Sequence, residues 1–545
     1  MAEATAGEHP VIDPSSFDLV VSGTGLVESL VAAAASASGK SVLHLDSNPY
    51  YGVHYSSLSP QSLSSFLQQN APAAADDDDG PRQPAPKSSV GVAVDLQPRR
   101  LYSHVEIAGE VPEPSRGFLL DLSGPRVLYC ADPMVDVMLR SGASHHIEFK
   151  SVDGSMIYWD GKLQMVPDSR EAIFKDKSLS LTEKTQMTRF LKLVREHITS
   201  EGGEGEEASK ISGPYLEMPF VKFLEKQRLP PKIKLIVLYA IAMADYDQDN
   251  PESCNKLMDT KEGLESLSLY SSSIGRFPNA VGALIYPIYG QGELPQAFCR
   301  LAAVKGALYV LRMPASSLLF DKEDKAYKGV RLATGQDINC HRILMDSSSV
   351  VPPPFPSPDP LESTIEASHA SKVARLVCIT RSSLHPQLSN ILIILPPRSL
   401  FPAQETSIRA LQLGSGLAVC PPDFFVVYCS TKCDDAIRGK EHLLAAMNAL
   451  FELPGGKNEQ DEHSGDLYIN ESTSKSKPVL LWSASYVQEL TEGCSLSSSP
   501  MPDGNLDYGS LLKSTEKLFH SLYPHEEFFT AGRPSEEEGD DITEG

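Results

Sequence analysis

The sequence predicts an α/β (α+β) chain in which an all-helical domain is inserted into a larger domain of strands and helices. Three observations support this fold class. A strand, a glycine-containing turn, a helix and a second strand follow one another near the start of the chain, over residues 17–46. Helical periodicity dominates residues 168–275, and short apolar strands return after residue 276. We therefore predict two structural parts, of which the first is discontinuous in sequence.

The first part begins with a βαβ unit. Residues 17–22 are a short apolar strand, and Gly23-Thr24-Gly25 makes the turn into an alanine-rich helix over residues 26–38. A second strand over residues 41–45 ends at Asp46. Parallel strands joined by a helix in this way form a right-handed crossover. This is the arrangement of a flavoprotein-like, dinucleotide-binding-type domain.

The glycine turn departs from the dinucleotide fingerprint, which has a third glycine where this chain has Glu28. That glycine lets the helix N-terminus approach the pyrophosphate, and a glutamate adds bulk and negative charge at the same place. We therefore expect no cofactor, and we interpret Gly23 and Gly25 as a tight turn in a vestigial nucleotide loop. The alternative is a working flavin or nicotinamide site that tolerates Glu28.

The inserted domain is predicted to span residues 168–275. Ser180 and Glu183 form a capping box, and apolar residues then recur at helical spacing. Three further helices are predicted over residues 219–227, 232–244 and 261–274. The discontinuous first domain then covers 17–167 and 276–522, with an insertion over 70–115 and a disordered acidic tail over 523–545. A hairpin is expected over residues 156–166, turned at Asp160-Gly161.

Composition excludes several classes of function. The chain of 545 residues has 48 basic and 71 acidic residues, a net charge of −23, which argues against binding to nucleic acid or to an anionic membrane surface. Its nine cysteines are scattered without zinc-ligand spacing. We find no secretory signal, no apolar run long enough to span a membrane and no catalytic motif, and therefore expect a cytoplasmic protein without catalytic residues or a metal.

Two long motifs are more specific than the glycine turn. They are VLHLDSNPYYG at residues 42–52 and YPIYGQGELPQAFCRL at residues 286–301. With Gly23-Thr24-Gly25, they resemble the family of the Rab GDP-dissociation inhibitors and Rab escort proteins. The resemblance runs from about residue 17 to about 335, and more weakly to about 522. Gln291, the insertion after the first βαβ unit, and the segments at 148–150 and 166–170 resemble the escort branch.

The resemblance implies a non-catalytic carrier. Such a protein binds newly made, GDP-bound Rab GTPases, presents them to Rab geranylgeranyltransferase as its accessory component, and keeps the prenylated Rab in solution until a membrane receives it. Its contact with membranes would be transient. Two alternatives stay open: an inhibitor that recycles prenylated Rabs without supporting prenylation, and a flavin-dependent oxidoreductase of the amine-oxidase type, which shares the fold.

The resemblance also assigns a Rab-binding platform to Tyr51, Glu293, Arg300 and Val310. Glu293 and Arg300 are two helical turns apart, so they share one edge of a helix. The family commonly has methionine where this chain has Val310, which puts that contact in doubt. Without the resemblance, a surface ion pair of small energetic value and a packing tyrosine would explain Tyr51, Glu293 and Arg300 equally well.

Three further sites follow from the resemblance, each with ordinary core packing as its alternative. An apolar helix matches the groove for the Rab C-terminus, and its candidate residues are Met134, Val135, Val137 and Met138. The helical domain must shelter a geranylgeranyl lipid, which costs on the order of 10 kcal/mol when it is left in water at ~0.8 kcal/mol per CH2. Its candidate lining residues are Phe190, Leu191, Val194, Leu235, Leu238 and Tyr239. Tyr270 is the candidate contact to the transferase.

Overall fold

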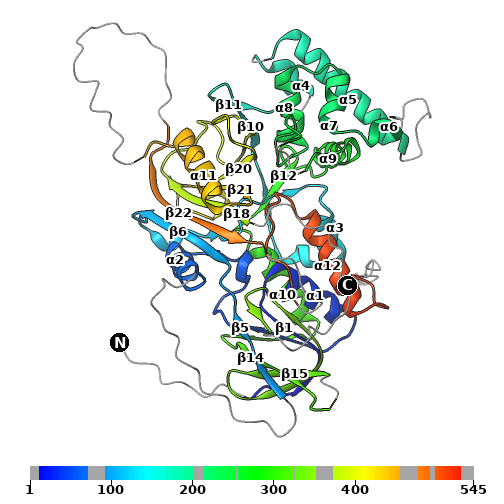
Figure 1. Ribbon diagram of the computed structural model, residues 1–545, viewed down its shortest axis with the longest axis vertical. Coiled ribbons are helices and arrows are strands. Elements are labelled where there is room, and N and C mark those ends of the chain that lie inside the picture. Colours follow the sequence, from blue (N-terminus) through cyan, green and yellow to red (C-terminus); the bar gives the residue numbers. More distant parts are fainter. Residues whose placement is uncertain are drawn as a thin grey trace, which may run out of the picture.

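The computed structural model contains two large β-sheets and a group of helices that forms one end of the molecule (Figure 1). The structure describes residues 11–71, 92–167, 170–177, 179–201, 211, 213–252, 256–323, 326–351, 372–453, 477–490 and 498–529. Among these residues, no helix is both long enough and apolar enough to cross a membrane.

The seven-stranded sheet contains the predicted βαβ unit, made of β1 (Ser16–Ser22), α1 (Leu26–Ala37) and β2 (Val42–Asp46). Its strand order is β13-β2-β1-β16-β15-β14-β4. The first four strands are parallel, and the last three are antiparallel to their neighbours. The remaining strands are β13 (Leu308–Leu311), β16 (Asp337–Met345), β15 (Tyr327–Leu332), β14 (Ala315–Phe320) and β4 (Val92–Asp95).

The eight-stranded sheet has the order β11-β10-β19-β20-β21-β18-β22-β6. The predicted hairpin is confirmed at its edge, and Asp160 and Gly161 both take positive φ in the turn. The strands are β11 (Lys162–Met165), β10 (Gly154–Trp159), β19 (Ile391–Leu395), β20 (Ile408–Gly414), β21 (Phe425–Cys433), β18 (Lys372–Thr380), β22 (Leu480–Glu489) and β6 (Tyr102–Gly109). Helix α11 (Ala436–Leu450) covers one face.

The helices between the hairpin and β12 pack together above the other face of this sheet (Figure 1). They are α4 (Arg170–Lys175), α5 (Leu181–Glu201), α6 (Gly213–Leu216), α7 (Phe220–Lys226), α8 (Pro231–Leu235) and α9 (Thr260–Ser273). The capping box of Ser180 and Glu183 is present at the start of α5. The helix predicted over 232–244 is shorter and irregular, because α8 continues as a π-helical segment, η5 (Ile236–Ile241). Apolar side chains of these helices share one core with the sheet.

Four helices complete the fold: α2 (Pro60–Gln69), α3 (Pro133–Ser141), α10 (Glu293–Val304) and α12 (Gly509–Leu522). Three small sheets pair β8 (Leu128–Tyr129) and β9 (Phe149–Ser151) with β12 (Leu284–Pro287), β5 (Gln97–Pro98) with β17 (Ser349–Val350), and β3 (Ser57–Leu58) with β7 (Leu120–Asp121). Helices α1, α3, α10 and α12 share a second apolar core.

The predicted insertion contributes strands to both large sheets, and the predicted start of the disordered tail needs correction. The expected insertion over 70–115 contains sheet strands, because β4 pairs with β14 and β6 pairs with β22. The tail expected to be disordered from residue 523 is structured as far as residue 529. Phe528 and Phe529 are each only 6% exposed, and Phe529 packs against Phe298 of α10. The rest of the tail lies outside the described residues, as do 72–91 of the expected insertion.

Candidate functional site

The vestigial nucleotide loop is tied to the strands on either side of it by its own side chains. Gly23 has φ +97, and a side chain there would collide with the carboxylate of Asp346, which follows β16. The backbone N–H and the hydroxyl of Thr24 both donate to Asp46 at the end of β2. His44 Nε2 lies 2.5 Å from the carbonyl oxygen of Gly23, and burial lowers the pKa of His44 to about 4. The acid that the fingerprint would place on a ribose therefore holds the loop itself.

Glu28 occupies the space over the second glycine. Its side chain is 3% exposed, and a Cβ at Gly25 would collide with Glu28 Oε2. The other carboxyl oxygen accepts a hydrogen bond from the hydroxyl of Ser499. Burial, and to a smaller extent Asp346 and Asp46, raises the pKa of Glu28 to about 8. At neutral pH the group is therefore largely a neutral carboxylic acid.

These contacts do not fit a bound flavin or nicotinamide dinucleotide. A pyrophosphate at this loop needs free backbone N–H groups at the start of α1 and close approach to the glycines. Here Glu28 and Asp346 fill the space beside Gly25 and Gly23, and Thr24 N–H is already bonded to Asp46. The raised pKa corrects one part of the sequence argument, because bulk and lost donors oppose the ligand more than negative charge does. Among the described residues no cluster of His, Cys, Asp or Glu suits a metal ion.

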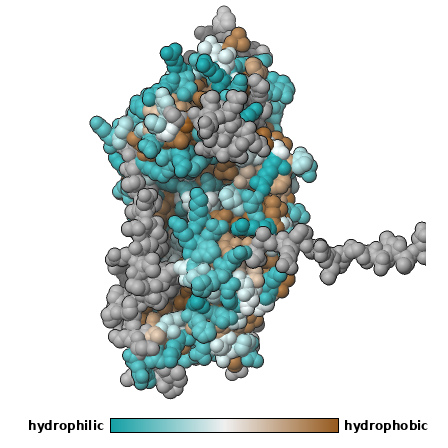
Figure 2. Space-filling model, turned by 90° about the vertical axis from the view of Figure 1, so that its right-hand side faces the viewer, coloured by the Kyte–Doolittle hydropathy of each residue, from teal (hydrophilic) through white to brown (hydrophobic). Residues whose placement is uncertain are grey.

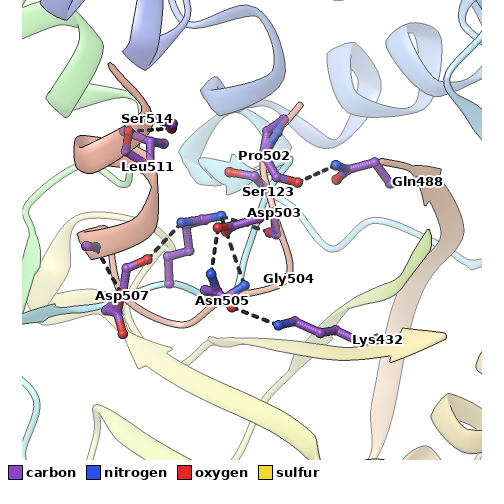
Figure 3. A network of polar contacts seen from close by, with 12 residues as sticks. Ser123, Lys432, Gln488, Pro502, Asp503, Gly504, Asn505, Asp507, Leu511 and Ser514 are labelled. Atoms are coloured by element: carbon purple, nitrogen blue, oxygen red, sulfur yellow. Dashed lines mark hydrogen bonds and ion pairs between the residues drawn. The ribbon is translucent and has the colours of Figure 1, made fainter. Parts of the chain in front are cut away.

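A segment far away in sequence closes the loop from the other side. Residues 498–508, which we call the C-terminal strap, run from Ser499 at Glu28 to the start of α12. Figure 3 shows the centre of the strap, where Asp503 and Asn505 are bonded to each other and Lys432 reaches Asn505 with a distance of 2.8 Å. Lys432 also binds Asp245, which lies between η5 and α9 of the helical part, at 2.7 Å. The strap therefore contacts the nucleotide loop and the eight-stranded sheet together.

Two buried arginines hold the strap. Arg126 is 0% exposed, forms an ion pair with Asp503, and donates to the carbonyl oxygens of Asp503 and Asp507 at 2.8 and 2.9 Å. Arg375 of β18 donates to the Asp503 carbonyl at 3.0 Å. Burial would raise the pKa of Asp503, but Arg126 and Lys432 outweigh it and lower that pKa. Sequence reasoning did not identify the strap, since the two arginines that hold it lie more than a hundred residues away.

The predicted platform lies along α10, which shares an apolar core with α1. Helix α10 packs its apolar stripe inward against α1, and Leu294, Ala297 and Phe298 are buried. Glu293 is half-buried and Arg300 is exposed on the outer edge of the helix. Burial raises the pKa of Glu293, and the charge of Arg300 opposes that shift. The predicted edge with an acid and a base two turns apart is therefore present.

Tyr51 and Val310 come to the same region from the sheet. Val310 is on β13 beside Leu45 of β2, and Tyr51 follows β2 in the chain. The rings of Tyr51 and Tyr309 meet edge to face with centroids 6.1 Å apart, and the Cys299 thiol of α10 lies close to both. The structure thus brings Tyr51 near α10 with its ring against Tyr309, a residue that sequence reasoning did not single out.

The motif at 286–292 is held in place by the buried carboxylate of Asp121. Asp121 accepts hydrogen bonds from Tyr286 Oη, from Ser57 Oγ at 2.6 Å and from the Gln291 N–H at 3.0 Å. Above this anchor, Tyr289 is 54% exposed and has φ +74, a conformation that tyrosine rarely adopts. An exposed aromatic side chain on a strained turn next to the platform is a residue that sequence reasoning did not single out, although the motif contains it.

The four residues predicted to line the groove for the Rab C-terminus are core residues in this structure. Met134, Val135, Val137 and Met138 are at most 4% exposed and pack in the core that α3 shares with α1, α10 and α12. Burial alone does not separate a groove from a core, so their role in binding the Rab C-terminus stays a prediction. The exposed side of α3 instead carries Leu139, which is 51% exposed.

The predicted lipid-lining residues also pack in a core. Phe190, Val194, Leu238 and Tyr239 are at most 3% exposed, and Leu191 and Leu235 are partly buried against the same cluster. The structure therefore brings the six residues into one apolar region of the helical part. Their burial is the same as that of ordinary core residues, so their role as a lipid site stays a prediction.

Tyr270, the predicted transferase contact, is half-buried on α9 and packs at the rim of the same core. Leu264 and Leu267 of the same helix are buried, as expected. Tyr270 therefore has an accessible part, and its proposed role stays a prediction.

Comparison with known proteins agrees with the geometry. The profile of the GDP dissociation inhibitor family matches residues 13–101 and 88–451. The chain is 50% identical to Rab escort protein 1 of Arabidopsis thaliana over 98% of both chains. It is 25% identical to human Rab proteins geranylgeranyltransferase component A 1, covering 94% of this chain and 92% of that protein. The fold matches the crystal structure of Rab GDI from Plasmodium falciparum with a TM-score of 0.67 at 17% identity, covering 94% of this chain and 99% of that one. The chain belongs to the GDP dissociation inhibitor family.

Proposed function

We propose that this protein is a Rab escort protein. It binds newly made, GDP-bound Rab GTPases, presents them to Rab geranylgeranyltransferase as a non-catalytic accessory component, and carries the prenylated product to membranes. The observation that supports this most is the 50% identity to a Rab escort protein over 98% of both chains. Glu28 and Asp346 fill the space beside the glycines of the nucleotide loop, which agrees with a carrier and argues against a flavin-dependent oxidoreductase.

The platform supplies the protein contact. Arg300 presents a charged group at the outer edge of α10, and Tyr51 brings a large side chain that is fixed by Tyr309. Residues of these types dominate binding energy at interfaces because they combine area with directional bonds. Arg300 stands on a packed helix, and the ring of Tyr51 rests against Tyr309, so little order has to be gained on binding.

The helical part would supply the lipid contact. A geranylgeranyl chain needs an apolar site, and α5, η5 and α9 share the largest apolar cluster that the helices offer. Because the candidate residues are buried against one another, a lipid can enter only if these helices move apart. The observed packing is therefore proposed to be the lipid-free state.

A prenylation assay tests the function. We expect that adding this protein to a Rab, the transferase and geranylgeranyl diphosphate accelerates prenyl incorporation into the Rab. Tyr270→Ala should reduce that acceleration while Rab binding survives. Lys261→Ala, at the exposed start of the same helix, is the matched control.

The assay separates the two remaining members of the family. If incorporation is no faster than without the protein, but prenylated Rab is extracted from membranes, then the chain is a recycling inhibitor. If Tyr270→Ala accelerates prenylation as the wild type and the control do, then Tyr270 does not contact the transferase.

A further inference from the structure

The corner between α4 and α5 exposes two large apolar side chains. Phe174 near the end of α4 is 57% exposed, and Leu181 at the start of α5 is 81% exposed. Their neighbours Ile173 and Leu179 are 2% and 5% exposed and belong to the helical core. The corner is therefore anchored from inside, and the exposed positions are fixed by the fold.

The two exposed side chains belong to one patch. Lys184 Nζ donates to the carbonyl oxygen of Phe174 at 2.8 Å, which joins the end of α4 to the first turn of α5. Residues three apart on a helix are neighbours, so Leu181 lies beside Lys184. Phe174 and Leu181 consequently flank a lysine at the same corner.

The outer face of α5 continues from this corner with basic residues. Leu181, Thr185, Arg189, Lys192 and Arg195 are exposed at the spacing of one helical stripe. Residues 170–201 contain seven basic and five acidic residues, whereas the whole chain has a net charge of −23. Three of the five acids are held locally, since Glu171 pairs with Lys175, Glu183 caps α5, and Glu196 pairs with Lys192. The helical end is thus locally basic on an acidic protein.

The corner lies at an end of the molecule, where a surface as flat as a lipid bilayer can contact it. The helical part forms one end of the molecule (Figure 1), and apolar side chains are exposed among hydrophilic ones at that end in the space-filling view (Figure 2). Protruding apolar side chains beside basic residues suit the boundary between headgroups and acyl chains of an anionic bilayer. A few such groups give weak, reversible binding, which a carrier that delivers and leaves requires.

We propose that the corner formed by Phe174 and Leu181, with the basic stripe of α5, is a site that contacts anionic lipid bilayers. The proposal rests on the carrier function above. The inner face of α5 carries Phe190 and Val194 of the predicted lipid site, so docking through this corner would bring that site close to the bilayer. The net negative charge of the chain argued against such a surface, but the charge is unevenly distributed.

Vesicle flotation tests the proposal with the full-length protein. The vesicles contain phosphatidylcholine with about a third phosphatidylserine, and pure phosphatidylcholine vesicles serve as the uncharged comparison. We expect Phe174→Ser/Leu181→Ser to weaken binding to the anionic vesicles about tenfold. The matched control is Ile437→Ser/Leu444→Ser on α11, where both side chains are also exposed, by 61% and 51%. The control should bind like the wild type.

A charge variant completes the test. Arg189→Glu/Lys192→Glu should also weaken binding to anionic vesicles, and it should leave binding to pure phosphatidylcholine unchanged. Equal binding by the wild type and the corner variant, with normal thermal melting, would overturn the proposal. So would loss of transferase-dependent prenylation in the corner variant without loss of vesicle binding, because the corner would then contact a protein. Rab affinity is measured in parallel, so a failure of the escort function is seen separately.

Discussion

Helices α1 and α10 pack side by side, but α1 buries an ionisable side chain where α10 exposes one. Glu28 in the first turn of α1 is turned inward, 3% exposed and bonded to Ser499. Arg300, on the outer edge of α10, is exposed. Both helices bury an apolar face against the other, so the difference lies in which polar groups are used internally and which are left available.

The comparison shows how a nucleotide-binding fold can serve as a carrier. At the nucleotide loop, side chains of the chain itself occupy the places where a cofactor would bind, so the polar groups of the loop bond within the protein. At α10, packing fixes the helix and leaves its edge free for a partner. The predictions below test whether the first region contributes stability and the second contributes binding.

The largest effect is expected at the strap. Asp503→Ala removes the charge that pairs with the fully buried Arg126, and an unpaired buried charge costs about 3 to 5 kcal/mol of unfolding free energy. Urea denaturation measures this loss. Asp136→Ala is the control, because its pair with Arg276 is partly exposed and should contribute less than about 1 kcal/mol. Equal losses in the two variants would show that the strap is not a stabilising joint.

A smaller effect, on binding alone, is expected at α10. Arg300→Glu should weaken the affinity for a GDP-bound Rab by about 2 to 3 kcal/mol, because the residue is exposed at the edge of a well-packed helix. Glu293→Arg and Tyr51→Ala should act in the same direction. Titration calorimetry measures the affinity, and thermal melting checks the fold. Arg438→Glu on α11 is the control; if it weakens binding as much, the loss is a general effect of charge.

The third prediction concerns pH. Glu28 has its pKa raised from 4.5 to about 8, so the folded state keeps a proton that the unfolded chain releases. Its contribution is fully present below the unfolded pKa and is lost as pH rises toward the folded pKa. Glu28→Gln keeps a neutral side chain at every pH, so its stability relative to the wild type should rise by about 3 to 4 kcal/mol between about pH 5 and about pH 8. A constant difference across that range would show that Glu28 is not protonated in the fold.

Sequence patterns predicted the local elements well. The βαβ unit, the hairpin at Asp160-Gly161 and the capping box of Ser180 each depend on residues close together in the chain, and all three are present. The outer edge of α10 was predictable for the same reason, since helical spacing alone separates Arg300 from the buried stripe.

Long-range packing was not predictable. Met134 is buried in a core that includes α12, which follows it by more than three hundred residues in the chain. The strap depends on Arg126 and Arg375, which nothing in the local sequence marks as partners of Asp503. Phe528 and Phe529 were assigned to a disordered tail because of the acidic residues after them, although their own side chains are apolar and buried.

The smallest effect separates binding from stability at a single residue. Tyr289 exposes 54% of its surface at φ +74, a conformation that costs a non-glycine residue about 1 kcal/mol. Backbone strain of this kind is found mostly at binding sites, where a contact requires it. Glycine adopts the same conformation without strain, so Tyr289→Gly should leave the unfolding free energy unchanged or raise it by up to about 1 kcal/mol. The same change should weaken Rab affinity by about 1 kcal/mol, because an exposed aromatic side chain next to Glu293 is lost. Tyr289→Phe, which keeps the ring, should bind almost normally. If Tyr289→Gly instead destabilises the protein and leaves Rab affinity intact, then the tyrosine serves the turn and the exposed platform ends at Glu293.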